Sequence, residues 1–247
     1  MKRLFVLLAF FVVLIQGCEV LDLEEFTRND EFQTSVMSAR DELRMSNVTV
    51  KAEFSHTIIL PTPSFEAQGS GVIFASEEGT HYVLTNHHVV DPGDRPYSEY
   101  AVHPFDTEDP IEAKLIDKDV TRDLAVLAFE DDASYETLDI FERKGDSLRR
   151  GEFVLAVGSP SAVDSIVTFG EFDRMVAIND VDFDVIAHCA LIYPGSSGGA
   201  LADADGNLIG INTWSAKNSD TNMSVPLDEV HDYLDSLEML EFHEDIE

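Results

Sequence analysis

The feature that most constrains the fold is a long succession of short β-prone runs, separated by turn residues, with no helix-length segment between successive runs. Six runs come before an acidic connector and five come after it. They cover residues 48–54, 57–60, 71–74, 82–85, 113–116 and 124–129, and then 153–157, 166–168, 185–187, 208–213 and 223–225. Parallel strands need a crossover of about a dozen residues or more, usually a helix. The pattern therefore predicts an all-β chain of two antiparallel barrels, with the break near residues 131–145.

The two ends of the chain depart from this pattern. From residue 227 to 242, apolar residues recur at helical spacing after a proline that a first helical turn tolerates, so we expect an amphipathic closing helix. Residues 18–46 are polar and acidic, with only a weak helical period. We expect them to form a tether or a loosely packed helix ahead of a domain over 47–247. Within that domain we expect barrel one at about 47–135 and barrel two at about 145–226.

The N-terminus has the pattern of a secretion signal. Lys2 and Arg3 precede an apolar run over residues 4–15, which is too short for a transmembrane helix of about 20 residues. The residues before Cys18 also resemble the lipobox of bacterial lipoproteins, in which the cysteine is lipidated and becomes the new N-terminus. We therefore expect residues 1–17 to be removed and Cys18 to hold the protein on the outer face of a bacterial membrane. The alternatives are an ordinary signal peptide cut elsewhere and an uncleaved anchor.

The second cysteine of the chain is Cys189. If Cys18 carries a lipid, no intramolecular disulfide is possible. We expect Cys189 to be a small buried apolar residue rather than a redox-sensitive thiol.

The charge balance restricts the partners of the protein. Forty-eight acidic residues against sixteen basic ones give a formal net charge of −32. Such a surface repels nucleic acid and anionic membrane faces, so we expect no nucleic-acid partner. The excess of acid either serves solubility in general or adapts the protein to a salty medium that screens the repulsion.

The strongest chemical signal is the run Pro-Gly-Ser-Ser-Gly-Gly at residues 194–199. A serine nucleophile needs an exposed hydroxyl and backbone N–H groups directed at the oxygen that becomes negative during acyl transfer. A Gly-x-Ser-Gly-Gly turn supplies both, and the amides of Gly195 and Ser197 are the candidate oxyanion hole. A loop rich in glycine and serine is more often only a loop, so this interpretation depends on finding the other catalytic partners.

Two such partners occur earlier in the chain. A His-His pair at residues 87–88 follows a predicted strand, and Asp123 stands at the start of another. A lone histidine is more often a core residue, and an aspartate before a strand is more often a turn former. Here His88, Asp123 and Ser197 follow one another at spacings of 35 and 74 residues, an order that predicts a Ser-His-Asp hydrolase. No metal-ligand cluster or phosphate-binding loop is recognisable, so we expect no metal and no cofactor.

These motifs resemble the trypsin-like serine peptidases of the chymotrypsin fold, and most closely the protease domain of the HtrA/Deg group, over about residues 48–234. The matching motifs lie at residues 68–73, 82–90, 122–127, 148–158, 168–170, 194–201 and 206–213. The resemblance implies two antiparallel six-stranded barrels and an endopeptidase that works through an acyl-enzyme. It selects His88, the histidine directly before valine, as the general base, with Asp123 as its orienting carboxylate and Ser197 as the nucleophile.

The resemblance also implies where substrate binds. It places Leu191 toward the floor of the specificity pocket, and a strand with Thr213, Trp214 and Ser215 along the substrate cleft. Trp214 is alternatively an ordinary core residue. Leu191 has no charge to pair with a basic side chain, so we expect the residue before the scissile bond to be a small or medium aliphatic one.

Some residues depart from the family pattern. Tyr193 and Ser196 stand where the family commonly has asparagine, and Ala200 replaces the usual proline. The family usually continues into PDZ domains, and we expect none in the 50 residues after Ser197. We expect an extracytoplasmic protease that acts on proteins or peptides and serves in protein quality control. A glutamyl endopeptidase and a catalytically silent binding module with the protease fold are the alternatives.

Overall fold

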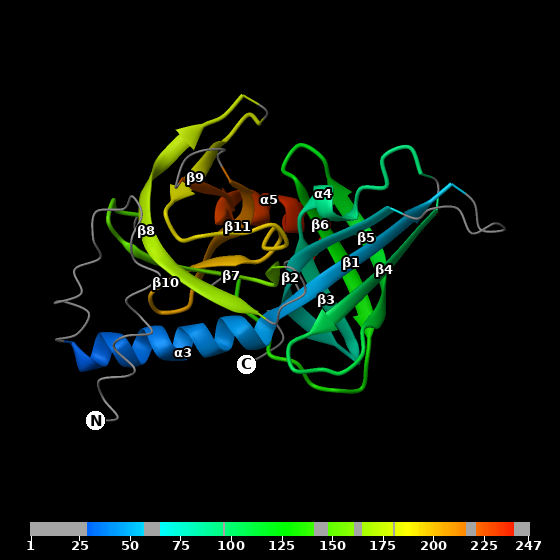
Figure 1. Ribbon diagram of the computed structural model, residues 1–247, viewed down its shortest axis with the longest axis horizontal. Helices are drawn as coiled ribbons and strands as arrows, with labels where there is room; N and C mark the ends of the chain where they lie inside the picture. The colour runs from blue at the N-terminus through cyan, green and yellow to red at the C-terminus, as the bar shows by residue number, and fades with distance from the viewer. Residues whose placement is uncertain are drawn as a thin grey trace.

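The computed structural model describes residues 29–56, 65–95, 97–140, 148–160, 165–179, 181–215 and 221–239. In this part of the chain the strands form two closed antiparallel barrels of six strands each, accompanied by helices (Figure 1). The predicted fold class is therefore confirmed. The expected signal peptide at residues 1–17, Cys18 and the predicted strand at 57–60 lie outside the described residues. None of the described helices combines the length and the apolar character that crossing a membrane requires.

Barrel one contains the first six strands. They are β1 (Asn47–Ser55), β2 (Phe65–Glu77), β3 (Thr80–Thr85), β4 (Tyr97–Pro104), β5 (Ile111–Asp119) and β6 (Leu124–Glu130). They close in the order β1-β2-β3-β6-β5-β4, and the short helix α4 (His87–Val90) follows β3. The sequence did not predict β4, because its first three residues are exposed and its apolar side chains Tyr100 and Val102 form only a weak alternation.

Barrel two contains the remaining six strands. They are β7 (Phe153–Gly158), β8 (Ile166–Ala177), β9 (Asp184–His188), β10 (Ala200–Asp203), β11 (Leu208–Ser215) and β12 (Asn222–Pro226). They close in the order β10-β11-β12-β9-β8-β7. The sequence did not predict β10, a strand of four residues that begins directly after the glycine-rich motif.

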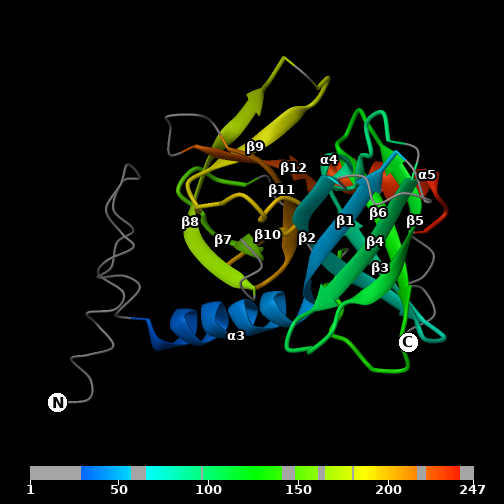
Figure 2. The same cartoon turned by 45° about the vertical axis from the view of Figure 1, so that its right-hand side comes forward.

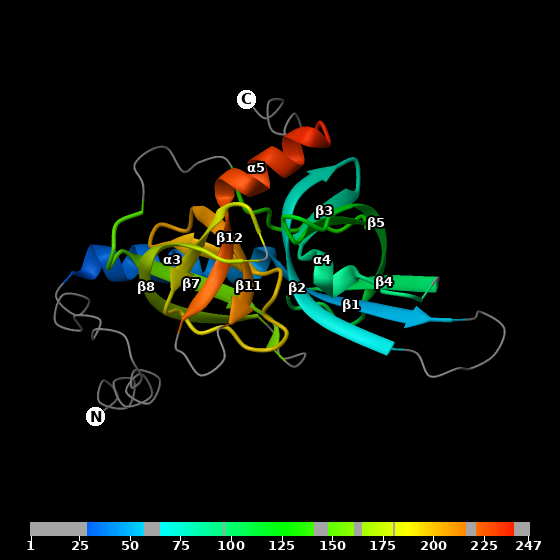
Figure 3. The ribbon, with the colours of Figure 1, turned by 90° about the horizontal axis from the view of Figure 1, so that it is seen from above.

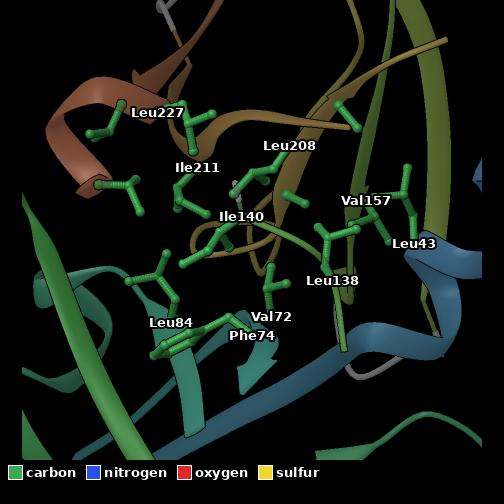
Figure 4. Close-up of a cluster of buried hydrophobic side chains, with 14 of the residues drawn as sticks. Leu43, Val72, Phe74, Leu84, Leu138, Ile140, Val157, Leu208, Ile211 and Leu227 are labelled. Atoms are coloured by element: carbon green, nitrogen blue, oxygen red, sulfur yellow. The ribbon is translucent and has the colours of Figure 1, made fainter. Parts of the chain in front are cut away.

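The largest buried cluster lies between the barrels and joins them. Figure 4 shows Val72, Phe74 and Leu84 of barrel one facing Val157 and Ile211 of barrel two. Strand β6 explains how this interface is built, because its side chains alternate between two cores. Leu124 and Val126 belong to the shared cluster, whereas Leu127 and Phe129 belong to the interior of barrel one. A strand buried on both faces appears in the sequence as an unbroken apolar run.

The segment before barrel one is the packed helix α3 (Asp30–Ser46). The Asn29 side chain accepts a hydrogen bond from the N–H of Phe32 at 3.1 Å and caps its first turn. Val36, Ala39 and Leu43 are at most 1% exposed and belong to the shared cluster. Of the two expectations for this segment, the tether does not hold for residues 30–46, which form a helix, and this helix packs on the core more closely than expected. Figure 2 shows α3 running beneath barrel two and continuing directly into β1.

The closing helix α5 spans Leu227–Ser236 and crosses the junction between the barrels, as Figure 3 shows from above. It ends earlier than the predicted residue 242. Glu238 takes a positive φ of 58°, and the N–H of Met239 donates to the carbonyl of Leu234 at 3.0 Å. This is the hydrogen bond of a Schellman cap, which ends a helix by satisfying its last carbonyls.

Cys189, directly after β9, takes part in a disulfide, so it is not the unbonded apolar residue that the sequence led us to expect. Its Sγ also accepts the N–H of Glu171 at 3.2 Å. Cys18 is the other cysteine of the sequence.

Candidate active site

His88 and Asp123 are joined by two hydrogen bonds. His88 lies on α4, just after β3, and Asp123 lies in the turn before β6. The Asp123 Oδ2 is 2.7 Å from Nδ1 of His88, and Oδ1 accepts the backbone N–H of the same residue at 2.8 Å. An acceptor on Nδ1 favours the tautomer with its proton there, which leaves Nε2 with a free lone pair. The ring is therefore oriented with a basic nitrogen away from the carboxylate.

Asp123 is held in an uncommon backbone conformation. Its φ is +55°, in the left-handed region that few residues other than glycine adopt. The fully buried Asn86 secures it, since its Nδ2 donates to the carbonyl of Asp123 at 2.8 Å and to Oγ1 of Thr213 at 3.1 Å. Strained residues of this kind cluster at functional sites because the surroundings fix them there.

Arg122, the neighbour of Asp123, connects this turn to α5. Its guanidinium donates to Asp119 at 2.8 Å and to Glu229 of α5 at 2.9 Å. The hydrogen bond with Asp119 is the main reason why the pKa of Arg122 is raised. Burial opposes ionisation of Asp119, but its hydrogen bonds with Arg122 outweigh that effect and lower its pKa. The turn that carries Asp123 is thus fixed on both sides.

The geometry separates the two adjacent histidines. The Nε2 of His87 is 3.9 Å from Oδ1 of Asp91, at the end of the same short helix. His88 alone of the pair makes hydrogen bonds with Asp123.

Ser197 lies in the loop between β9 and β10, so it comes from barrel two. Its Oγ donates to the carbonyl of Thr213 at 3.3 Å, and the described residues include no hydrogen bond between Ser197 and His88. Thr213 lines the same pocket as His88 and Asp123. Ser197 thus contacts a residue of the pocket that His88 and Asp123 line, and of the three predicted residues only His88 and Asp123 are joined by hydrogen bonds in the described structure.

The loop around Ser197 adopts a conformation that depends on glycine. Gly195 and Gly198 have φ values of +101° and +91°. The N–H of Gly198 donates to the carbonyl of Asn212 at 2.8 Å. Within the described part of the chain, the N–H groups of Gly195 and Ser197 have no acceptor. These two donors are therefore available to a ligand.

A cavity of about 310 Å³ lies beside His88 and Asp123. Thr213 and Trp214 line it, as the sequence predicted for cleft residues, whereas Leu191 and Ser215 do not. The remaining wall is formed by residues that the sequence analysis missed, namely Val120, Thr121 and Val181. Val120 and Thr121 directly precede the Arg-Asp motif, which was the available signal, but Val181 arrives from the β8–β9 connection only through folding.

Residues 69–211 match the family model of the trypsin-like peptidase domain. This chain belongs to that family. The "Serine protease Do-like HtrA" of Bacillus subtilis (strain 168) is 37% identical over 163 residues, which make up 62% of this chain and 34% of the relative. The "Probable periplasmic serine protease do/HhoA-like" of Haemophilus influenzae is 34% identical over 154 residues, 61% of this chain and 31% of that protein. The chain thus matches about a third of the length of each of these two relatives.

A solved structure agrees with the family assignment. The crystal structure of the serine endoprotease from Yersinia pestis superimposes with a TM-score of 0.63 at 28% sequence identity. The match covers 82% of this chain and 66% of that one. The predicted resemblance to trypsin-like peptidases of the HtrA group is confirmed.

Proposed function

We propose that this trypsin-like peptidase is a serine endopeptidase that hydrolyses peptide bonds through an acyl-enzyme. The observation that carries the proposal is the double hydrogen bond between Asp123 and His88, at 2.7 and 2.8 Å, beside the loop that holds Ser197. A carboxylate that orients a histidine next to a serine is the arrangement that activates a serine for acyl transfer.

In this mechanism each group has one task. Ser197 Oγ turns from the carbonyl of Thr213 toward Nε2 of His88, loses its proton to that nitrogen and attacks the scissile carbonyl. Asp123 holds the ring and stabilises the imidazolium that forms. The N–H groups of Gly195 and Ser197 donate to the oxygen that becomes negative. His88 then gives the proton to the leaving amine, and a water molecule hydrolyses the ester.

Labelling with a fluorophosphonate tests the proposal, because this probe phosphonylates an activated serine. The wild type is expected to react, whereas Ser197→Ala does not react at all. His88→Ala is expected to lower kcat on denatured casein by about 10⁴-fold. His87→Ala is the matched control and is expected to retain most activity. A wild type that neither reacts nor cleaves casein contradicts the proposal.

One observation favours a second function, a binding module that keeps the fold without catalysis. Ser197 Oγ bonds to the carbonyl of Thr213 at 3.3 Å instead of to His88. If that bond persists with substrate present, the serine is never activated. A folded wild type that binds casein without cleaving it is the outcome that supports this alternative.

We propose further that the substrates are proteins outside the cytoplasm, including unfolded ones, and that the residue before the scissile bond is aliphatic. The Haemophilus influenzae relative is named as a probable periplasmic protease, and the apolar Val120 and Val181 face the active-site cavity. Cleavage of a peptide library tests the preference. A dominant preference for glutamate supports the glutamyl endopeptidase alternative, and one for arginine or lysine rejects Leu191 as the pocket floor.

Attachment to a membrane through a lipid on Cys18 is a separate proposal, and it requires that the disulfide of Cys189 does not include Cys18. The sulfur of Cys18 cannot carry a thioether-linked lipid and form a disulfide with Cys189 at the same time. The mass of the mature protein therefore distinguishes the two. The mature protein is expected to carry a lipid on Cys18 and to partition into detergent, and Cys18→Ala is expected to abolish both. An unlipidated protein whose two cysteines are linked by a disulfide rejects the anchor.

A further inference from the structure

Ser70, on β2 of barrel one, contacts the nucleophile loop of barrel two at two points. Its backbone N–H donates to the carbonyl of Ser197 at 2.7 Å. Its Oγ donates to the carbonyl of Gly195, also at 2.7 Å. Ser70 itself is completely buried, so its own polar groups are shielded from water. One residue therefore holds the carbonyl groups of both residues whose N–H groups form the candidate oxyanion hole.

The hydroxyl of Ser70 is itself fixed in direction. It accepts the backbone N–H of Ser159 at 2.7 Å, so its own proton is directed at Gly195. The carbonyl of Ser70 accepts Thr85 Oγ1 at 2.6 Å, which holds the strand from the other side. The loop lies directly against this strand, since a Cβ on Gly198 would be 2.1 Å from the carbonyl oxygen of Ser70.

This clamp matters because Gly195 has no side chain to restrict its backbone. With a φ of +101°, glycine is the residue that tolerates this conformation, but it also rotates more freely than any other. The carbonyl of Gly195 shares one planar peptide group with the N–H of Ser196, which lies between the two donor residues and donates to the carbonyl of Tyr193 at 2.8 Å. A hydrogen bond on the Gly195 carbonyl therefore fixes this central peptide group, and with it restrains the two flanking peptide groups that carry the donor N–H groups of Gly195 and Ser197.

We propose that Ser70 is a positioning residue that keeps the oxyanion-hole donors of Gly195 and Ser197 directed at the reacting carbonyl. The inference rests on the proposed peptidase function and extends it to a residue outside the predicted catalytic set. Preorganised donors stabilise charge that develops in the transition state, and they contribute little to binding of the ground state. Loss of the Ser70 hydroxyl is thus expected to lower kcat and to leave KM nearly unchanged.

The test compares Ser70→Ala with Ser46→Ala. Ser46 is also a buried serine, but its hydroxyl donates to the carbonyl of Leu43 at 3.3 Å, within α3. Removing one partner of a buried hydrogen bond changes an equilibrium constant or a rate constant by about ten- to a hundredfold. Ser70→Ala is therefore expected to lower kcat on denatured casein, and the rate of fluorophosphonate labelling, by about ten- to a hundredfold at unchanged KM. Ser46→Ala is expected to change only thermal stability.

The outcomes separate this inference from the proposed function. A wild type without turnover or labelling rejects the proposed function itself. An active wild type, with a folded Ser70→Ala variant that keeps its kcat and labelling rate, overturns the role of Ser70. An equal loss of kcat in both variants, measured well below their melting temperatures, overturns it as well. If Ser70→Ala does not fold, Ser70→Cys retains a weaker donor at the same place and is expected to show a smaller kcat deficit at unchanged KM.

Discussion

Acidification from pH 7 to pH 5 is expected to destabilise the fold through the buried residue His188, at the end of β9. Its side chain is about 1% exposed, and its Nε2 lies 3.1 Å from Oγ of Ser224. Among the described residues, its Nδ1 has no hydrogen-bond partner of normal geometry. Burial lowers the pKa of His188 from 6.5 to about 3, against a weaker opposing effect from the backbone of Ala190.

The sign and size of the effect follow from this pKa. His188 stays neutral in the folded protein, whereas the unfolded chain takes up a proton as the pH falls below the reference value of 6.5. The contribution of neutral His188 to the free energy of unfolding is therefore complete above pH 6.5, and it is lost progressively as the pH falls toward about 3. One pKa unit corresponds to about 1.4 kcal/mol, so the free energy of unfolding is expected to fall by about 2 kcal/mol between pH 7 and pH 5 through this residue.

Urea denaturation at pH 7, 6 and 5 measures this loss. The comparison is with His188→Gln, whose amide nitrogen can still reach Ser224 but does not titrate. Other titrating groups contribute equally to both proteins, so the difference between the two curves isolates His188. The wild type is expected to lose about 2 kcal/mol more than the variant over this range. Parallel curves would refute the reasoning.

Three further predictions concern charge, the nucleophile loop and α3. With a net charge of −32, the melting temperature is expected to rise from low to molar NaCl and then level off, as the Debye length falls to about 3 Å; a constant or falling value contradicts salt adaptation. Gly198→Ala places a Cβ 2.1 Å from the Ser70 carbonyl, so it is expected to lower the melting temperature strongly and to abolish fluorophosphonate labelling. Gly151→Ala, also at positive φ but with no atom within 4 Å, is expected to cost only about 1 kcal/mol. Leu43→Ala is expected to cost about 2–5 kcal/mol in chemical denaturation because α3 belongs to the core, and an unchanged stability would mean that α3 is dispensable.

The strand that is clearest in the sequence is one that is buried on both faces. β6 has six consecutive buried residues, so its apolar run is visible without any knowledge of its neighbours. Strand β4 has only alternate buried residues and polar residues between them, and β10 is four residues long. Both become strands because neighbouring strands need partners to close each barrel, and that requirement is not local in sequence.

The same distinction applies to α3. Its polar composition suggested a tether or a loosely packed helix, because a helix with few apolar residues has little apolar surface to bury. Ala39 belongs to the core because the loop that contains Gly206 packs closely against it. A Cβ on Gly206 would lie only 3.2 Å from the Ala39 side chain. Small residues allow such a close approach, and they carry almost no hydrophobic signal of their own.

The sequence by itself determined the family, the two-barrel class and the residue types of the candidate site, because a nucleophile loop and its partners need particular residues in a particular order. Tertiary structure decided which residues meet. It set His88 against Asp123 at 2.7 Å, brought Val181 to the cavity wall, and placed Ser70 of barrel one against the loop of barrel two. The hydrogen bond between Ser70 and Gly195 joins residues 125 positions apart, and a bond of about 3 Å between them depends on how the two barrels pack rather than on any local pattern.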